Sequence, residues 1–102
     1  MSYVQRVQKA VDFIESKLTE KIRLPEIAKV AAFSPYHFHK IFSLTVGETM
    51  KDYIRKRRLT EAALRLRDSG ERILDLAIEY QFESQAAFSR AFKKQFEIPP
   101  AQ

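Results

Sequence analysis

Hydrophobic residues recur every three or four positions along much of the chain, which is the spacing of one face of an α-helix. The first run extends from Tyr3 to Leu18, and its apolar positions are Val4, Val7, Ala10, Val11, Ile14 and Leu18. A short second run begins at Pro25 and ends near Ala31. Proline suits the first turn of a helix, where its missing N–H needs no partner. These patterns predict two helices before residue 32.

A third helix is predicted from Pro35 to about Val46. Ser34 can cap its start by accepting a backbone N–H, and Gly47 can end it in the left-handed conformation. The positions expected to be buried are Phe38, Ile41, Phe42 and Thr45.

A longer helix is predicted from Met50 to Asp68. Its expected inward residues are Tyr53, Ile54, Leu59, Ala62, Ala63 and Leu66. The four cations Arg55 to Arg58 cover a full turn, so we expect Arg58 to lie partly toward the core and to reach outward with its charged end. Arg57 lies four residues before Glu61 and should pair with it.

The last third of the chain repeats an earlier part. A short helix is predicted over Ile73–Tyr80 and a longer one over Gln85–Phe96, with Phe88, Phe92 and Phe96 inward. The pairs that repeat at an offset of 49 or 50 are Ile27 with Leu76, Phe33 with Phe82, Ser34 with Ser84, Phe38 with Phe88, Lys40 with Arg90 and Phe42 with Phe92. The repeat predicts an all-α fold of two helix-turn-helix units, about 4–47 and 73–100, joined by a linker helix at 50–68 within a single domain, 1–102.

Composition agrees with one small helical domain and argues against several classes of function. The chain has 102 residues, is 45% hydrophobic and 30% charged, and has no cysteine. It contains no glycine-rich phosphate loop and no recognisable nucleophile–base pair, so we expect neither an enzyme nor a cofactor. His37 and His39 are two residues apart without a third ligand at suitable spacing, so we expect no metal. Without an apolar run of membrane-spanning length or a signal peptide, we expect a cytoplasmic protein with no membrane partner.

Positive charge is concentrated in three stretches. The net charge is +5, but residues 35–46, 51–67 and 85–96 together hold eleven basic and two acidic residues. Such segregation favours a polyanionic partner. The outward positions of 35–46 and 85–96 carry no acid, as a helix that enters a DNA major groove requires. Arg and Lys can bind guanine, Gln can bind adenine, and Ala can contact the thymine methyl group.

These features resemble the AraC-type (arabinose-regulator) family of bacterial transcription regulators over Val7 to Pro100. The resemblance rests on Ile27-Ala28, Phe33-Ser34-Pro35-Tyr36-His37-Phe38, Phe42 and Gly47, on Tyr53-Ile54, Arg58-Leu59, Ala62 and Leu64, and on Ile73, Ala77, Phe82-Glu83-Ser84-Gln85, Phe88-Ser89-Arg90-Ala91-Phe92-Lys93-Lys94 and Pro99. It implies base contacts from Tyr36, His39 and Lys40 in the first unit and from Gln85, Ala86, Ser89 and Arg90 in the second. For the DNA phosphates we expect contacts from His37, Arg55, Arg57, Lys93 and Lys94.

Three positions depart from the family pattern. Ala32 and Gln81 stand where the family commonly has glycine in each turn, and a left-handed backbone there would cost about 1 kcal/mol. Ala86 and Ala87 leave fewer polar groups on the second recognition helix. The chain ends at Gln102, where the family usually continues into a Tyr-Arg pair and a short last helix.

The resulting hypothesis is a sequence-specific transcription regulator that inserts two recognition helices into successive major grooves of double-stranded DNA. The linker helix spans about 28 Å, slightly less than the roughly 34 Å between successive major grooves. We therefore expect a monomer to bind a non-palindromic site of about 20 base pairs, with some bending of the DNA when both units engage. RNA polymerase is a candidate partner, and any effector domain of the intact protein is expected after residue 102. The alternative hypothesis is a helical protein-interaction module that docks an acidic partner through its basic face.

Overall fold

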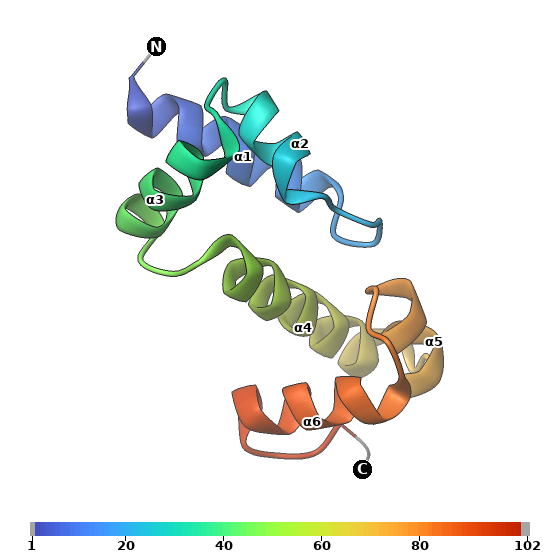
Figure 1. Ribbon diagram of the computed structural model, residues 1–102. Coiled ribbons are helices and arrows are strands. Elements are labelled where there is room, and N and C mark those ends of the chain that lie inside the picture. Colours follow the sequence, from blue (N-terminus) through green and yellow to red (C-terminus); the bar gives the residue numbers. More distant parts are fainter. Residues whose placement is uncertain (1, 101–102) are drawn as a thin grey trace. The chain divides into compact units, whose positions relative to one another are not determined.

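Every regular element of the described chain is an α-helix (Figure 1). The computed structural model describes residues 2–100. Its helices are α1 (Tyr3–Ser16), α2 (Leu24–Val30), α3 (Pro35–Val46), α4 (Met50–Ser69), α5 (Ile73–Glu79) and α6 (Gln85–Phe96). The all-α prediction is confirmed, and the predicted bounds of α3 and α6 agree with the structure residue for residue.

The chain divides into two compact units inside α4. Residues up to Ile54 belong to unit 1, and residues from Arg55 onward belong to unit 2. The helix that the sequence suggests as a linker therefore contributes its first residues to one unit and the rest to the other.

Unit 1 is built on α1, α2 and α3, drawn in blue to green in Figure 1. Its buried apolar residues are Val7, Ala10, Ile14, Leu18, Ile27, Ala28, Ala31, Phe38, Phe42, Met50 and Ile54. The rings of Phe38 and Phe42 lie 5.8 Å apart, and Phe42 lies a further 5.8 Å from Tyr53 of α4. The Tyr53 hydroxyl donates to Glu15 Oε2 at 2.9 Å and so ties α4 to α1.

Unit 2 is built on the remainder of α4 with α5 and α6. Its buried apolar residues include Leu59, Ala62, Leu76, Ala77, Tyr80, Phe88 and Phe92. Phe82 in the turn before α6 lies edge-on to Phe88 at 5.1 Å, and Phe88 and Phe92 lie 5.8 Å apart. Each unit thus has its own aromatic core, formed by the buried phenylalanines of α3 in unit 1 and of α6 in unit 2.

The turn between the short and the long helix has the same backbone conformation in both units. Ala32 and Gln81 have φ of 63° and 68°, so both are left-handed. In unit 1 the amide of Phe33 donates to the carbonyl of Ala28, and in unit 2 the amide of Phe82 donates to that of Ala77. A second bond, from the left-handed residue to Lys29 or Ile78, completes the Schellman arrangement that ends a helix.

A serine then starts each long helix. The Ser34 hydroxyl accepts from the amide of His37 at 3.4 Å, and the Ser84 hydroxyl accepts from that of Ala87 at 3.0 Å. At the other end, Gly47 has φ of 92°, and Glu97 takes the equivalent left-handed position with φ of 64°. The repeat therefore extends to both ends of α3 and α6.

Several expectations about burial are wrong. Val4 is 67% exposed, because it lies in the first turn of α1, and Thr45 is exposed near the end of α3. Phe96, Ile41, Val11, Tyr53, Ala63 and Leu66 are half-buried rather than fully inward. The first helix ends at Ser16, although Leu18 beyond it is buried as expected. The other helices differ from their predicted bounds by one residue.

Candidate nucleic-acid interface

The exposed face of α3 carries the predicted base-contacting residues of unit 1. Tyr36, His39 and Lys40 are all exposed, and Tyr36 is 75% exposed despite its size. The Lys40 ammonium lies over the Tyr36 ring, 5.0 Å from its centroid. This cation–π contact places the charge and the ring together on the outside of the helix. A hydrogen-bond donor and a flat apolar surface are therefore presented side by side.

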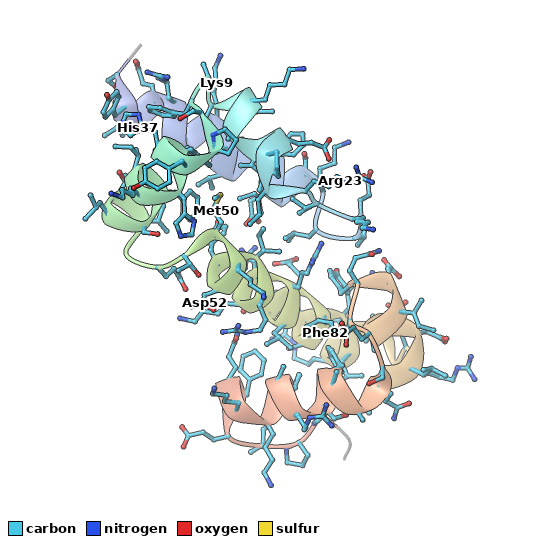
Figure 2. The ribbon with its side chains drawn as sticks, in the orientation of Figure 1. Lys9, Arg23, His37, Met50, Asp52 and Phe82 are labelled. Atoms are coloured by element: carbon cyan, nitrogen blue, oxygen red, sulfur yellow. The ribbon has the colours of Figure 1, made fainter. Side chains whose placement is uncertain are left out.

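His37 belongs to an aromatic cluster at the start of α3, although its side chain is exposed. Its ring lies edge-on to Phe33 at 5.5 Å and to Tyr3 of α1 at 6.3 Å between centroids. Figure 2 labels His37 at this end of α3. The cluster orients the imidazole, which remains accessible to a phosphate group from outside.

The exposed face of α6 carries the predicted residues of unit 2. Gln85, Ala86 and Arg90 are exposed, whereas Ser89 is half-buried and presents less of its surface. Lys93 and Lys94 are exposed in the last turn, where they also favour the negative end of the helix dipole. Because the helix has no acid, these cations meet no opposing charge from α6 itself.

The cations of α4 differ in how much of each side chain is exposed. Arg55 is exposed. Arg57 is half-buried and binds Glu61 at 3.0 Å, which confirms the predicted pair. Arg58 is also half-buried, and its burial lowers the pKa of its guanidinium, as expected for a cation on the core side. Of these two predicted phosphate contacts, Arg55 thus exposes more of its side chain than Arg57.

Acidic residues of unit 2 gather at the α4–α5 junction and bind arginines there. Arg65 binds Glu71, with Nε 2.9 Å from Oε2, and it also binds Glu79 of α5. Its hydrogen bonds to Glu79 and then Glu71 raise the pKa of Arg65, and the same contact lowers the pKa of Glu71. Two further pairs join Arg67 to Asp68 and Arg72 to Asp75. Three arginines, Arg65, Arg67 and Arg72, are therefore paired with acidic residues at this junction.

A basic groove lies between α4 and α6 within unit 2. Its volume is about 600 Å³, and its lining residues are Arg55, Lys56, Ala91, Lys94 and Gln95. The sequence predicted Arg55 and Lys94 as phosphate contacts but missed Lys56 and Gln95. Lys56 lies outside the repeated segments and no local pattern marks Gln95, because the pairing of α4 with α6 depends on tertiary structure.

The structure brings the predicted residues together in two sets, each carried by one long helix with its capped turn. Tyr36, His37, His39 and Lys40 belong to α3, and Gln85, Ala86, Ser89, Arg90, Lys93 and Lys94 belong to α6. Within residues 2–100, no three acidic or histidine side chains form a cluster that could hold a metal ion. No helix in this part of the chain is both long and apolar enough to cross a membrane.

Comparison with known proteins matches residues 27–102 to the helix-turn-helix domain family. A relative in Bacillus subtilis strain 168, the uncharacterized HTH-type transcriptional regulator YbfP, is 49% identical over 100 residues. That match covers 98% of this chain but 34% of YbfP, so the chain spans about a third of its relative.

Two solved structures share the fold. A transcriptional regulator with an AraC-type DNA-binding domain from Chromobacterium violaceum aligns with a TM-score of 0.89 and 23% identity, covering 95% of this chain and 87% of that one. The DNA-binding domain of the transcription factor AdpA, in complex with a target DNA, aligns with a TM-score of 0.85 and 23% identity. That match covers 94% of this chain and 86% of the AdpA chain.

Proposed function

Because the chain belongs to the AraC-type family of helix-turn-helix transcription regulators, we propose that it binds double-stranded DNA through α3 and α6 and thereby regulates transcription. The observation that carries the proposal is the repeated turn. In each unit a left-handed residue and a serine cap precede a long helix whose exposed face has no acid. A helix with these properties suits the DNA major groove.

Specific side chains can distinguish bases on both helices. Lys40 and Arg90 are exposed cations at equivalent positions of the repeat, and each can donate to guanine O6 and N7. Gln85 can bind adenine at the start of α6, and Ala86 can contact a thymine methyl group. We assign Tyr36 and His39 to base edges in the patch bound by α3. We assign Ser89 a smaller share of the base contacts than these residues, because its side chain is half-buried.

Phosphate contacts supply affinity without sequence preference. We assign them to His37, Arg55, Lys93 and Lys94, whose side chains are exposed, and with a smaller share to Arg57, whose side chain is half-buried. Such contacts release counterions, so the affinity should fall steeply as the salt concentration rises.

One chain carries two recognition helices, so we propose that a monomer binds a non-palindromic site. The site should contain two contact patches about ten base pairs apart, one for each unit. A regulator of this family acts on the chromosome, and we therefore place its action in the cytoplasm. RNA polymerase is the further partner that we propose for a promoter-bound regulator.

The alternative is a protein-interaction module whose basic surface docks an acidic partner. A mobility-shift assay on promoter DNA over a series of salt concentrations distinguishes the two functions. The proposal predicts a steep dependence on salt and binding that survives an excess of nonspecific competitor DNA. Absence of binding to any duplex at low salt would contradict it and favour the protein-interaction module.

A further inference from the structure

The cation–π pair on α3 has no counterpart on α6. The Lys40 ammonium lies 5.0 Å from the centroid of the Tyr36 ring, which belongs to the preceding turn of the helix. At an offset of 50 the repeat places Arg90 and Ala86 in these two positions of α6. The methyl group of Ala86 offers no ring on which Arg90 could rest. The two recognition helices therefore present their outward cations in different ways.

Lys40 is held by an aromatic ring rather than by an acid. Helix α3 contains no aspartate or glutamate. Within residues 2–100 the Lys40 ammonium forms no hydrogen bond or ion pair, and the Tyr36 ring is its neighbour. A lysine side chain is otherwise a flexible four-carbon stem that carries a compact charge. The ring thus restricts where the ammonium lies without neutralising it.

Both members of the pair are accessible to a ligand. Tyr36 is 75% exposed, and Lys40 is also exposed. In unit 2 another tyrosine, Tyr80, lies under Arg65, but Tyr80 is buried and two glutamates bind Arg65. That contact belongs to the core of unit 2 and its rim. The contact of Tyr36 with Lys40 lies outside any core, so both side chains remain available to a base.

The spacing of the two groups fits neighbouring base pairs. Successive bases along a DNA strand are about 3.4 Å apart. Because the ammonium and the ring centroid are 5.0 Å apart, an ammonium that contacts one base pair leaves the ring beside the next. Lysine donates to guanine O6 and N7, and an apolar side chain contacts the methyl group of thymine. The pair therefore suits a guanine and a thymine in adjacent base pairs.

We propose that Tyr36 positions Lys40, and that the two side chains read a guanine and an adjacent thymine as one unit. A cation that is already held in place loses less conformational freedom when it binds. Arg90 receives no such support from Ala86, so the corresponding bases in the patch of α6 are read independently. This inference rests on the proposed DNA-binding function and names the base step that α3 recognises.

Modified bases in a selected operator test whether the two contacts are coupled. 7-Deazaguanine removes the N7 acceptor of guanine, and uracil lacks the methyl group of thymine. The guanine that Lys40 reads is the one at which 7-deazaguanine no longer affects binding of Lys40→Ala. Fluorescence anisotropy measures the affinity of the full chain for duplexes that carry neither change, either change, or both.

We expect the effects of the two modified bases to differ between the patches. In the patch of α3, each change alone should weaken binding about twofold to tenfold, and both together should cost less than the product of the single losses, because the contacts are coupled. In the patch of α6 the single losses should multiply.

Two substitutions of Tyr36 separate positioning from simple contact. Tyr36→Leu removes the ring and keeps an apolar side chain, whereas Tyr36→Phe keeps the ring. We expect Tyr36→Leu to lower the discrimination between guanine and 7-deazaguanine at the base read by Lys40 about twofold to fivefold, and Tyr36→Phe to preserve it. In the Lys40→Ala background, Tyr36→Leu should have no further effect on this discrimination. Discrimination at the guanine read by Arg90 is the internal control and should stay unchanged, and thermal unfolding checks that each variant is folded.

The outcomes separate this inference from the proposed function. If Tyr36→Leu leaves the discrimination at the guanine read by Lys40 intact, or lowers it no more than Tyr36→Phe does, the positioning role is overturned and the proposed function stands. If the single losses multiply in the patch of α3 as they do in that of α6, reading as one unit is overturned in the same way. If the wild-type protein binds no duplex, the proposed function and this inference are both overturned.

Discussion

Arg6 of α1 donates through Nε to the carbonyl oxygen of Ala31 at 2.9 Å, at the point where α2 ends. Its Nη2 atom also donates to the carbonyl of Ala32, and its guanidinium lies 3.6 Å from the centroid of the Phe33 ring. One side chain thus contacts three successive residues of the left-handed turn. Helix α1 thereby supports the turn that positions α3.

We expect Arg6→Gln to destabilise unit 1 by about 1–2 kcal/mol, because hydrogen bonds from a charged donor to two carbonyls are lost. Arg6→Lys should recover only part of this, since an ammonium lacks the planar arrangement of donors. Chemical denaturation checks both variants. Equal stability of Arg6→Gln and the wild type would show that the turn does not depend on this contact.

The left-handed residues of the two turns should respond to glycine in the same way. Ala32→Gly and Gln81→Gly should each stabilise the protein by about 0.5–1 kcal/mol, because glycine removes the Cβ strain at φ near 65°. Ala31→Gly is the matched control, since Ala31 has an ordinary φ of −81° and should lose stability. Melting temperatures measure all three, and a loss of stability at both turns would contradict the account of strain.

The aromatic cores should be essential to each unit. Phe42→Ala and Phe92→Ala should each cost about 3–5 kcal/mol, because Phe42 is fully buried and Phe92 nearly so. Phe96→Ala should cost less, because Phe96 is only half-buried. Urea denaturation gives the three values, and equal losses for Phe92 and Phe96 would disagree with the observed burial.

The two arginines expected to bind phosphate should not be equivalent. Neutralising Arg55 and Arg57 together should weaken binding to all DNA sequences alike and lower the salt slope by about one to two. The single change Arg55→Gln should account for more of this than Arg57→Gln, because the Arg55 side chain is exposed whereas that of Arg57 is half-buried. Titration of DNA with each variant over a series of salt concentrations measures the affinities and the salt slopes. A loss on one DNA sequence only, at an unchanged slope, is incompatible with phosphate contacts.

Local sequence signals predicted the helices and the two turns well. Ser34, Ser84 and Gly47 mark helix ends through backbone chemistry that involves only neighbouring residues. The glycines that the family commonly has in each turn indicated where a left-handed backbone would fall, and Ala32 and Gln81 have it. Such features can be recognised without knowledge of tertiary packing.

Features that depend on a distant helix could not be predicted in this way. Periodicity indicates which face of a helix is apolar but not how far its neighbour extends, so Val4 and Thr45 were wrongly assigned to the core. The contact of Arg6 with the turn and the groove beside Lys56 each join residues at least 25 positions apart. Their sequence neighbourhoods contain no corresponding signal.

Footprinting of Lys40→Ala and Arg90→Ala on a selected operator tests the central claim most directly, because these exposed cations occupy equivalent positions on α3 and α6. We expect each variant to lose about 1–3 kcal/mol of discrimination in a different patch, with the patches about ten base pairs apart and one protein chain bound. The account is contradicted if both variants lose protection at the same patch, or if binding requires an inverted repeat and two chains.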